Sequence, residues 1–412
     1  MSDFLVGNLL YGQSGGPSPV INASAYGVIN EARKRGQLIQ RIFAMHHGIQ
    51  GLLNEDFIDI AELPDSQIDL LPHTPGAAFG SVRYKLKPYE VDETDYKKIL
   101  EVFKKYNIRY FFYNGGNDSM DTCHKISEYC KLHNYECRIV GIPKTIDNDL
   151  PLTDHTPGFG SAAKFIANAF MEMSYDNDAY PTGRVNIVEV MGRHAGWLTA
   201  SSALATHHGF GPDLIYVPEV PFDVEKFKVD VKRIFDEKKR CLVAVSEGTR
   251  DLNGEFVATV GTSKDAFGHK QLGGVASTLL RVLEDEVGLP CRAIEISLLQ
   301  RCASHLQSKT DVTEAIDVGS TAVKLACHGK SGVMVTIVRE SSDPYIATYS
   351  YAHLKDVANV EFKMPRYMIN EAGNGITQEF IKYVAPLIEG GTKPIYRNGV
   401  QQMARLRKFI NK

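Results

Sequence analysis

The chain has 412 residues, of which 43% are hydrophobic and 23% are charged, and its formal net charge is −3. This length suggests two domains, and the charge balance argues against the strongly basic face that nucleic-acid binding usually requires. No apolar run approaches ~18 residues, and no basic region precedes the first short apolar run. We therefore expect no nucleic-acid partner, no membrane span and a cytoplasmic location.

The seven cysteines point in the same direction. Their number is odd, and none of them are paired as CxxC. Reduced thiols of a cytosolic protein are therefore expected, rather than disulfides or a zinc site.

Short β-branched or aromatic runs alternate with longer amphipathic stretches, which predicts an α/β fold with mostly parallel sheets covered on both faces. In such sheets ligands bind beyond the carboxyl ends of the strands. The expected strands are Phe4–Tyr11, Arg109–Asn114, Cys137–Ile142, Val185–Met191, Leu214–Val217, Cys241–Val245 and Ser331–Val338. The expected helices are Val20–Lys34, Asp121–Leu132 and a long one within Pro157–Ala179, which would cross from a first sheet to a second.

Two glycine-rich turns follow the first two of these strands. Gly12–Pro17 opens a helix, so its backbone can approach a ligand closely and its free N–H groups can bind an anion. Asn114–Ser119 places two glycines before Asp118, which could bring a phosphate and a magnesium ion together. The alternatives are glycines with a steric role only, and an Asp or Ser that caps the next helix.

A third turn, Pro143–Asp149, carries acidic and basic groups close together. Asp147 and Asp149 share a face in extended backbone, and Lys144 precedes them. One carboxylate could take a proton from a hydroxyl while the lysine holds a transferring phosphoryl group. The alternative is a polar turn with a surface ion pair.

A fourth turn, Glu189–Gly196, contains Gly192, which lets the chain pass close to a substrate, and Arg193, which could clamp phosphate oxygens. Arg292 and Arg301 are further basic residues near the ends of apolar stretches. The alternative for each arginine is a solvated surface side chain.

In this order and spacing, these segments resemble the phosphofructokinase family. The signatures are SGGPSPVINA (14–23), GGNDS (115–119), PKTIDND (143–149) and EVMGRHAGWLTA (189–200), with supporting matches GSVR (80–83), VSEG (245–248) and RAIEISLLQR (292–301). The resemblance implies two Rossmann-like α/β/α domains with the active site in the cleft between them. Residues 1–157 plus about 300–370 would form the phosphoryl-donor domain, and 158–299 plus about 371–412 the sugar-phosphate domain.

The resemblance also implies roles for the matching residues. Asp147 looks like the general base for the sugar 1-hydroxyl, and Lys144, Asp118, Arg193 and Asp149 complete the implied catalytic set. Sugar-phosphate contacts are implied for Thr145, Ile146, Asp147, Met191, Gly192, Arg193, Glu247, Arg184, Arg292 and Arg301. Donor contacts are implied for Gly15, Gly16, Arg83, Gly116, Asp118 and Lys144. In the family, the residues that match Arg184 and Arg292 come from a neighbouring subunit, which implies a homodimer or homotetramer.

Two positions bear on the donor. ATP-dependent members of the family typically carry glycine at the positions of Asp118 and Lys144, whereas this chain resembles the pyrophosphate users. A carboxylate at 118 repels the α-phosphate of a nucleotide, and a lysine at 144 supplies charge to a compact inorganic donor. The predicted reaction is reversible phosphoryl transfer from pyrophosphate to fructose 6-phosphate, with Mg²⁺ as cofactor and Asp118 in the metal site.

Some positions depart from the family pattern. Asn117 stands where an aspartate is usual, Leu298 where many relatives have a histidine, and Cys302-Ala303 where they have two glycines. The chain beyond Gln307 matches the short ATP-dependent enzymes poorly. The alternative hypotheses are an ATP-dependent phosphofructokinase, a nucleotide or lipid kinase with a Gly-Gly-acid turn, and a catalytically weak regulatory homologue.

Overall fold

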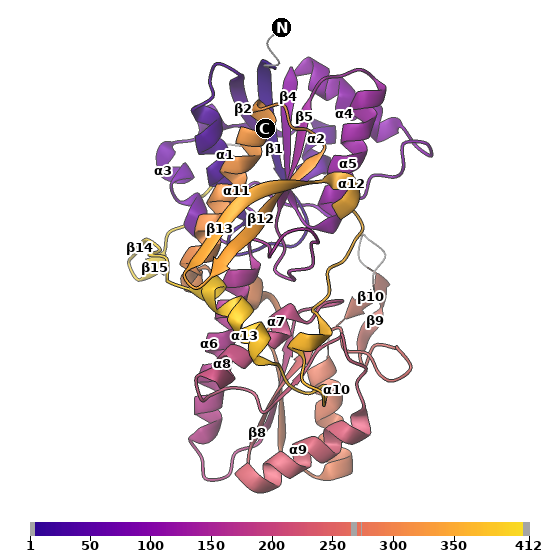
Figure 1. Cartoon of the computed structure of the whole chain (residues 1–412), viewed down its shortest axis with the longest axis vertical. Coiled ribbons are helices and arrows are strands. Elements are labelled where there is room, and N and C mark those ends of the chain that lie inside the picture. Colours follow the sequence, from indigo (N-terminus) through magenta and orange to yellow (C-terminus); the bar gives the residue numbers. More distant parts are fainter. Residues whose placement is uncertain (1–4, 265–269, 273, 407–412) are drawn as a thin grey trace.

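Two separate β-sheets organise the part of the chain that the computed structural model describes, residues 5–264, 270–272 and 274–406. Within these residues the larger sheet has seven strands in the order β13-β12-β5-β4-β1-β2-β3, and it lies in the upper half of Figure 1. Its strands are β1 (Gly7–Gln13), β2 (Ile39–Met45), β3 (Phe57–Asp59), β4 (Ile108–Gly115), β5 (Arg138–Pro143), β12 (Val333–Ser342) and β13 (Tyr345–His353).

The centre of the larger sheet is parallel, as predicted. β1 pairs in parallel with both β2 and β4, and β5 pairs in parallel with β4 and β12. Side chains of successive residues in β4 enter two different cores, Tyr110 and Phe112 on one face and Phe111 and Tyr113 on the other. This burial on both faces explains why β4 is a continuous aromatic run rather than an alternating one.

Helices cover both faces of the larger sheet. One core contains residues of α1 (Ile21–Arg33) and α11 (Lys309–Cys327), and the other contains residues of α2 (Gly48–Asn54), α4 (Thr94–Lys105) and α5 (Asn117–Leu132). The short helices α3 (Asp65–Ile68) and α12 (Leu354–Val357) also pack in this unit.

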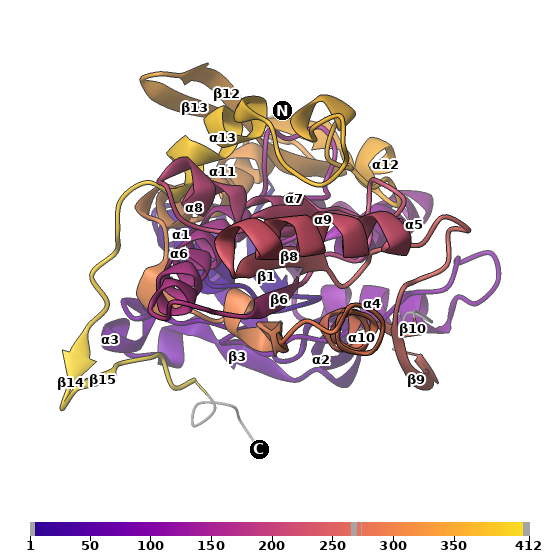
Figure 2. The same cartoon turned by 90° about the horizontal axis from the view of Figure 1, so that it is seen from below.

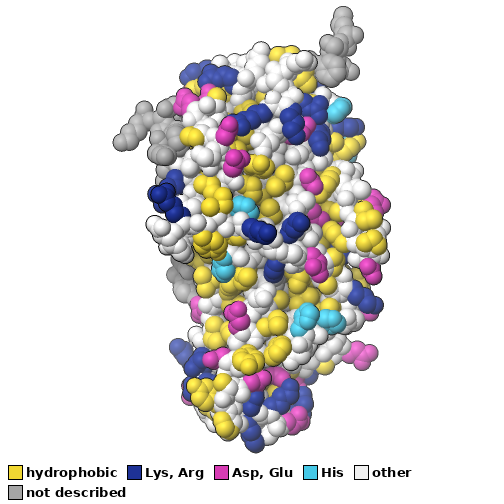
Figure 3. All heavy atoms as spheres, turned by 90° about the vertical axis from the view of Figure 1, so that its left-hand side faces the viewer, with side chains coloured by type: hydrophobic (Ala, Val, Ile, Leu, Met, Phe, Trp, Pro, Cys, Tyr) yellow, Lys and Arg dark blue, Asp and Glu magenta, His cyan; other side chains and the backbone are white. Residues whose placement is uncertain are grey.

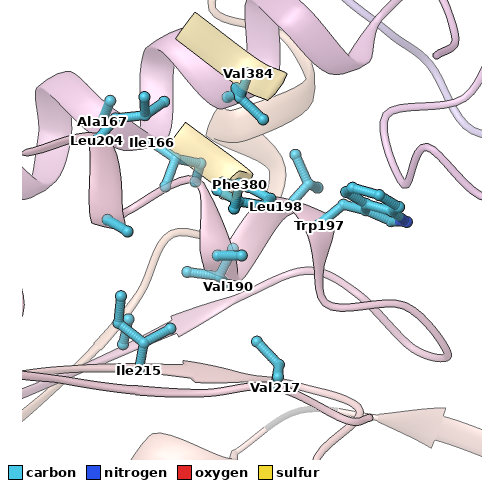
Figure 4. Close-up of a cluster of buried hydrophobic side chains, with 14 of the residues drawn as sticks. Ile166, Ala167, Val190, Trp197, Leu198, Leu204, Ile215, Val217, Phe380 and Val384 are labelled. Atoms are coloured by element: carbon cyan, nitrogen blue, oxygen red, sulfur yellow. The ribbon is translucent and has the colours of Figure 1, made fainter. Parts of the chain in front are cut away.

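The smaller sheet has four parallel strands in the described residues, in the order β11-β6-β8-β7. Figure 2 views this unit from below, with α9 nearest the viewer. The strands are β6 (Val185–Val190), β7 (Leu214–Tyr216), β8 (Cys241–Ser246) and β11 (Cys291–Glu295). The helices around it are α6 (Phe159–Asp178), α7 (Trp197–Ala200), α8 (Ala203–His207), α9 (Val224–Lys238), α10 (Val275–Val282) and α13 (Gln378–Val384). Figure 4 shows the core on one face, to which Val190, Trp197, Ile215, Phe380 and Val384 all belong.

The chain passes repeatedly between the two units. α6 carries it from β5 to β6, as the sequence predicted, and α11 returns it to the larger sheet after β11. Residues 358–364 descend again to α13, and the last described residues return, so that Leu406 joins a core of the larger sheet. The proposed division into two discontinuous domains stays a prediction.

Element boundaries differ from the predictions by a few residues. The helix expected from Asp121 begins at Asn117, which places Asp118 in its first turn, where a helix N-terminus favours negative charge. The first strand runs from Gly7 to Gln13, and the Phe4 end of its predicted range lies outside the described residues. The seven cysteines are all free thiols, and only Cys302 is exposed.

The outer surface carries charge of both signs. Figure 3 shows lysines and arginines together with acidic side chains on one face, with apolar side chains between them, in keeping with the small net charge. Among the described residues, no helix is both long enough and apolar enough to span a bilayer. Two short antiparallel pairs, β9 (Thr259–Lys264) with β10 (Lys270–Leu272) and β14 (Tyr396–Arg397) with β15 (Val400–Gln401), complete the described strands.

The packing of α1 on α11 depends on two glycines. A Cβ on Gly27 would lie 2.0 Å from the carbonyl oxygen of Ile316, and a Cβ on Gly319 would lie 2.1 Å from that of Ser24. The helix backbones are therefore in direct contact, and no side chain fits between them.

We predict that Gly319→Ala lowers the free energy of unfolding by about 2 kcal/mol, because the new methyl group forces the two helices apart. The loss would occur despite the better helix propensity of alanine, which acts in the opposite direction. Urea denaturation measures it. Gly36→Ala is the control, since a Cβ there meets nothing within 4 Å; equal midpoints for the two variants would contradict the packing.

Candidate active site

A pocket of about 310 Å³ lies between the two units, at the carboxyl ends of strands from both sheets. The turns after β1, β4 and β5 form one side, and the turns after β6 and β8 form the other. The lining residues are Ser14, Gly15, Gly16, Pro17, Arg83, Gly116, Asn117, Asp118, Ser119, Lys144, Thr145, Ile146, Asp147, Asp149, Met191, Arg193, His194, Ala195, Glu247, Arg301 and Glu361. The structure therefore brings together most of the residues that the motifs singled out.

The first glycine turn holds a neighbouring segment in place. Gly15 has φ +75°, and its N–H donates to the carbonyl of Val82 at 3.3 Å. The hydroxyl of Ser81 donates to the carbonyl of Gly15 at 2.7 Å. These bonds fix the GSVR segment against the turn and bring Arg83 into the pocket wall.

The second turn forms the start of α5. Gly116 is the residue before the helix, and Asp118 lies in its first turn, with its carboxylate 3.8 Å from the ammonium group of Lys85. The side-chain oxygen and nitrogen of Asn117 are buried, and neither meets a hydrogen-bond partner among the described residues. This end of the pocket thus offers helix N–H groups, a carboxylate and an unsatisfied amide to a ligand.

Lys144 is the most deeply placed cation of the pocket, with 3% of its surface exposed. Its ammonium group donates to the carbonyl of Gly16 at 2.6 Å, and its backbone N–H donates to the carbonyl of Gly115. Burial lowers the pKa of Lys144 from 10.5 to about 8, although Asp147 and Asp149 oppose this by favouring the charged form. A buried ammonium group interacts strongly with an anion because little water screens it.

Asp147 and Asp149 face the same pocket. Burial raises the pKa of both carboxyl groups, and for Asp147 the negative charges of Asp149 and Glu247 add to the effect. The N–H of Asp147 donates to the hydroxyl of Thr145 at 3.1 Å, which shapes the turn. A carboxylate with a raised pKa is suited to accept a proton from a substrate hydroxyl near neutral pH.

The turn after β6 is anchored to the end of β8. Gly192 has φ +143°. Its N–H donates to Glu247 Oε1 at 3.3 Å, and its carbonyl accepts a hydrogen bond from the Ser246 hydroxyl at 2.5 Å. The N–H of Met191 donates to Gln300 Oε1 at 3.1 Å. Gly192 itself does not line the pocket, but these bonds place Met191 and Arg193 in its wall.

The predicted arginines have different positions. Arg301 ends a 3-10 helix, Ser297–Arg301, and reaches across the pocket, so that a Cβ on Gly16 would lie 3.4 Å from Arg301 Nη1. Arg184 and Arg292 are exposed, stand at or near the amino ends of β6 and β11, and do not line this pocket. Leu298 is also exposed and lies outside the lining.

These groups allow the pocket to bind two anionic ligands side by side and to accept a proton from a hydroxyl group of one of them. Arg83, Lys144, Arg193 and Arg301 supply positive charge along it, and the charges of Lys144 and Arg301 act on the Asp147 carboxylate in the same pocket.

Comparison with known proteins identifies the group to which this site belongs. A model of the family "Phosphofructokinase" matches residues 8–326. The chain belongs to the phosphofructokinase family. A Halomonas elongata protein named pyrophosphate–fructose 6-phosphate 1-phosphotransferase is 46% identical over 404 residues, which cover 97% of this chain and 96% of that protein. A Methylococcus capsulatus protein of the same name is 45% identical over 97% of this chain and 96% of its own length.

A solved structure agrees with this assignment. The crystal structure of a pyrophosphate-dependent phosphofructokinase from Nitrosospira multiformis matches with a TM-score of 0.88 at 42% identity, over 97% of this chain and 96% of that one. The predicted family and the α/β fold of the phosphofructokinases are therefore confirmed. An unrelated kinase with only a Gly-Gly-acid turn is excluded.

Three residues around this phosphofructokinase pocket received no role from the motifs. His194 lies within the quoted EVMGRHAGW signature, and its Nδ1 is 3.4 Å from the carboxylate of Glu361. Glu361 belongs to a segment with no recognisable pattern, so nothing in the sequence could place it here. Lys85 follows GSVR by two residues, and only the position of Arg83 hinted that it would approach Asp118.

We predict that Asp147→Asn stabilises the fold at pH 8 by about 1–2 kcal/mol, because it removes a carboxylate whose pKa is raised from 3.8 by burial. Below pH 3.8 the carboxyl group is protonated in both the folded and the unfolded state, so the gain vanishes there and grows as the pH rises toward the raised pKa. Urea denaturation at pH 5 and pH 8 measures it. Asp118→Asn, with a side chain 36% exposed, is the control, and its effect should be small; an equal gain for Asp147→Asn at both pH values would contradict the argument.

Proposed function

We propose that this phosphofructokinase transfers a phosphoryl group reversibly from pyrophosphate to the 1-hydroxyl of fructose 6-phosphate, which gives fructose 1,6-bisphosphate and phosphate. The observation that carries the proposal is the buried ammonium group of Lys144 beside Gly16, with Asp118 at the start of α5. Lys144 supplies charge to an inorganic donor that has no adenosine to anchor it, and Asp118 repels the α-phosphate of a nucleotide. The names of the relatives at 45% and 46% identity support the same donor.

In this proposal the donor lies against the larger sheet, which corresponds to the predicted donor domain of residues 1–157 plus about 300–370. The turns at Gly15, Gly16 and Gly116 let the backbone come close to its oxygens, which the N–H groups of Gly16 and Gly116 bind, and Arg83 and Lys144 neutralise its charge.

The sugar phosphate lies against the smaller sheet, in the predicted domain of residues 158–299 plus about 371–412. Glu247 accepts hydrogen bonds from its hydroxyls, and Thr145, Ile146 and the Met191–Arg193 turn enclose its reacting end. Arg301 binds its phosphate from within the same chain.

The transfer reaction requires a base for the attacking hydroxyl and a leaving group for the phosphorus that it attacks. The Asp147 carboxylate, with Asp149 beside it, takes the proton of the 1-hydroxyl as that oxygen attacks the terminal phosphorus of pyrophosphate. The bond from this phosphorus to the bridging oxygen breaks, and orthophosphate leaves with the electron pair. Arg193 and Lys144 stabilise the negative charge on the oxygens of the transferring phosphoryl group in the transition state. In the reverse direction, protonated Asp147 returns the proton.

The residues present fit a magnesium ion at the donor end. Mg²⁺ is usually bound by one or two carboxylates together with substrate phosphates, and Asp118 offers the carboxylate. Asn117, the preceding residue in the sequence, stands where an aspartate is usual, and its side-chain oxygen is buried without a partner among the described residues. Bound there, Mg²⁺ would neutralise the charge of the donor.

A second subunit completes the sugar-phosphate site in this proposal. Arg184 and Arg292 are exposed on this chain and lie outside its own pocket, as expected for side chains that serve a neighbour. A homodimer or homotetramer with shared arginines therefore stays our prediction, and so does the cytoplasmic location.

The donor is tested directly by following fructose 1,6-bisphosphate formation with Mg²⁺ and either pyrophosphate or ATP as the only phosphoryl source. We expect turnover with pyrophosphate and little with ATP, and a loss of kcat of at least about a hundredfold for Asp147→Asn. Replacing both Asp118 and Lys144 by glycine should shift the preference toward ATP.

Turnover with ATP alone would keep the fold and the base but overturn the donor assignment. Inactivity with both donors would favour the catalytically weak regulatory homologue.

A pH series tests the charge on Lys144. Its pKa is lowered to about 8, so above this pH the free enzyme loses one positive charge at the donor end, and the KM for pyrophosphate should rise. Lys144→Arg keeps its charge throughout, so its KM, though higher at pH 7, should not rise with pH in the same way. If the KM for pyrophosphate rose with pH in the same way for the wild type and for Lys144→Arg, a group other than Lys144 would control donor binding.

A further inference from the structure

Tyr383, on α13, lies behind the acidic turn rather than in the pocket. Its hydroxyl accepts a hydrogen bond from the Asn148 side-chain amide at 2.9 Å and donates one to the carbonyl of Asp154 at 2.7 Å. The hydroxyl therefore connects the middle of the acidic turn to the segment that follows it. No motif in the sequence marks this tyrosine.

Asn148 stands between the two carboxylates of the site. It has φ +54°, a left-handed conformation that asparagine tolerates better than most residues, and 1% of its surface is exposed. Its side-chain oxygen accepts the N–H of Thr156 at 3.0 Å, and its nitrogen reaches Tyr383. Since Asn148 is flanked by Asp147 and Asp149, its anchoring determines the direction in which both carboxylates point.

The ring of Tyr383 contacts the other half of the site. Its centroid is 5.3 Å from the ring of Trp197, which begins α7 directly after the turn that carries Met191 and Arg193. Figure 4 shows Trp197 in the core below α13. The guanidinium of Arg339 lies over the Tyr383 ring, 4.8 Å from its centroid, and donates to the Tyr383 carbonyl at 2.9 Å.

A second contact ties the same two turns together. The N–H of Phe362 donates to the carbonyl of Asp149 at 2.7 Å, and its ring stacks on Trp197 with centroids 5.6 Å apart. Tyr383 and Phe362 thus each hydrogen-bond to the acidic turn and each pack against Trp197. Of these links, only the one through Tyr383 holds a side chain of the turn itself.

We propose that Tyr383 is a positioning residue for phosphoryl transfer: its hydroxyl fixes Asn148, and with it Asp147 and Asp149, while its ring keeps this pair aligned with the Met191–Arg193 turn through Trp197. The inference rests on the proposed function. Tyr383 does not line the pocket, so it would act only through the residues that it holds.

The expected consequence is a loss of rate with little loss of binding. Tyr383→Phe leaves Asn148 Nδ2 and the Asp154 carbonyl without their partner, so the acidic turn gains freedom, and transfer rates depend steeply on the placement of the base. The donor contacts of Arg83, Lys144 and the first glycine turn are unchanged. We expect kcat to fall about tenfold, while the KM values for both substrates change less than about twofold.

Tyr349→Phe is the matched control. Tyr349 is on β13, and its hydroxyl donates to Asp317 Oδ2 at 2.9 Å, outside the active-site pocket. Both variants lose one tyrosine hydroxyl from a hydrogen bond, so a general effect on stability would appear in both. The thermal midpoint and the emission of Trp197, which is the only tryptophan in the sequence, report whether the surrounding core stays intact.

Hydrogen–deuterium exchange supplies a test that needs no turnover. In Tyr383→Phe the amides of residues 145–156 should exchange faster, and in Tyr349→Phe they should not. Unchanged exchange in this segment, or an unchanged kcat in an otherwise active enzyme, would overturn the positioning role. A loss confined to KM, or a loss of kcat shared by Tyr349→Phe, would do the same. If the wild type turns over with neither pyrophosphate nor ATP, the proposed function fails, and exchange alone then decides the role of Tyr383.

Discussion

The burial of one ammonium group, that of Lys144, is the constraint around which the rest of the site is arranged. A cation held at 3% exposure must be compensated, and here a backbone carbonyl of the first glycine turn and two nearby carboxylates do so. That requirement draws together the ends of β1 and β5, with β4 between them. Because all three strands are parallel, their carboxyl ends meet on one edge, and the compensation needs no long loop.

The carboxylates of Asp147 and Asp149 also cost folding free energy, because both are charged groups in a desolvated site. Asp147 and Asp149 repel one another, and they remain in the pocket because the chain around them is fixed from several directions. Thr145 and Asn148 shape the turn from within, and Tyr383 holds it from a helix of the other unit. Strain of this kind is common where function requires groups that stability alone would not keep.

The sequence alone predicted the parts of this arrangement that depend on local patterns. The strands could be found because residues such as Phe111 and Phe112 are buried on opposite faces, and the glycine turns because they end those strands. The contact of Glu361 with His194 and that of Tyr383 with Asn148 could not be predicted, since both join segments that are far apart in the sequence, and neither Glu361 nor Tyr383 belongs to a periodic or motif signal. The start of α5 lies earlier than predicted for a simpler reason. The polar residues Asn117 and Asp118 begin the helix, although in the sequence they look like part of a turn.

The strand order has a consequence for synthesis on the ribosome. β5 is paired on one side by β4, which precedes it closely, but its other neighbour is β12, whose register places Val333 beside Val140. One edge of a central, apolar strand therefore stays open until the whole smaller sheet has been translated. The larger sheet cannot be completed before the residues of the smaller sheet have been translated. In the growing chain the upper half therefore presents an unpaired edge, which is open to a chaperone or to another nascent chain.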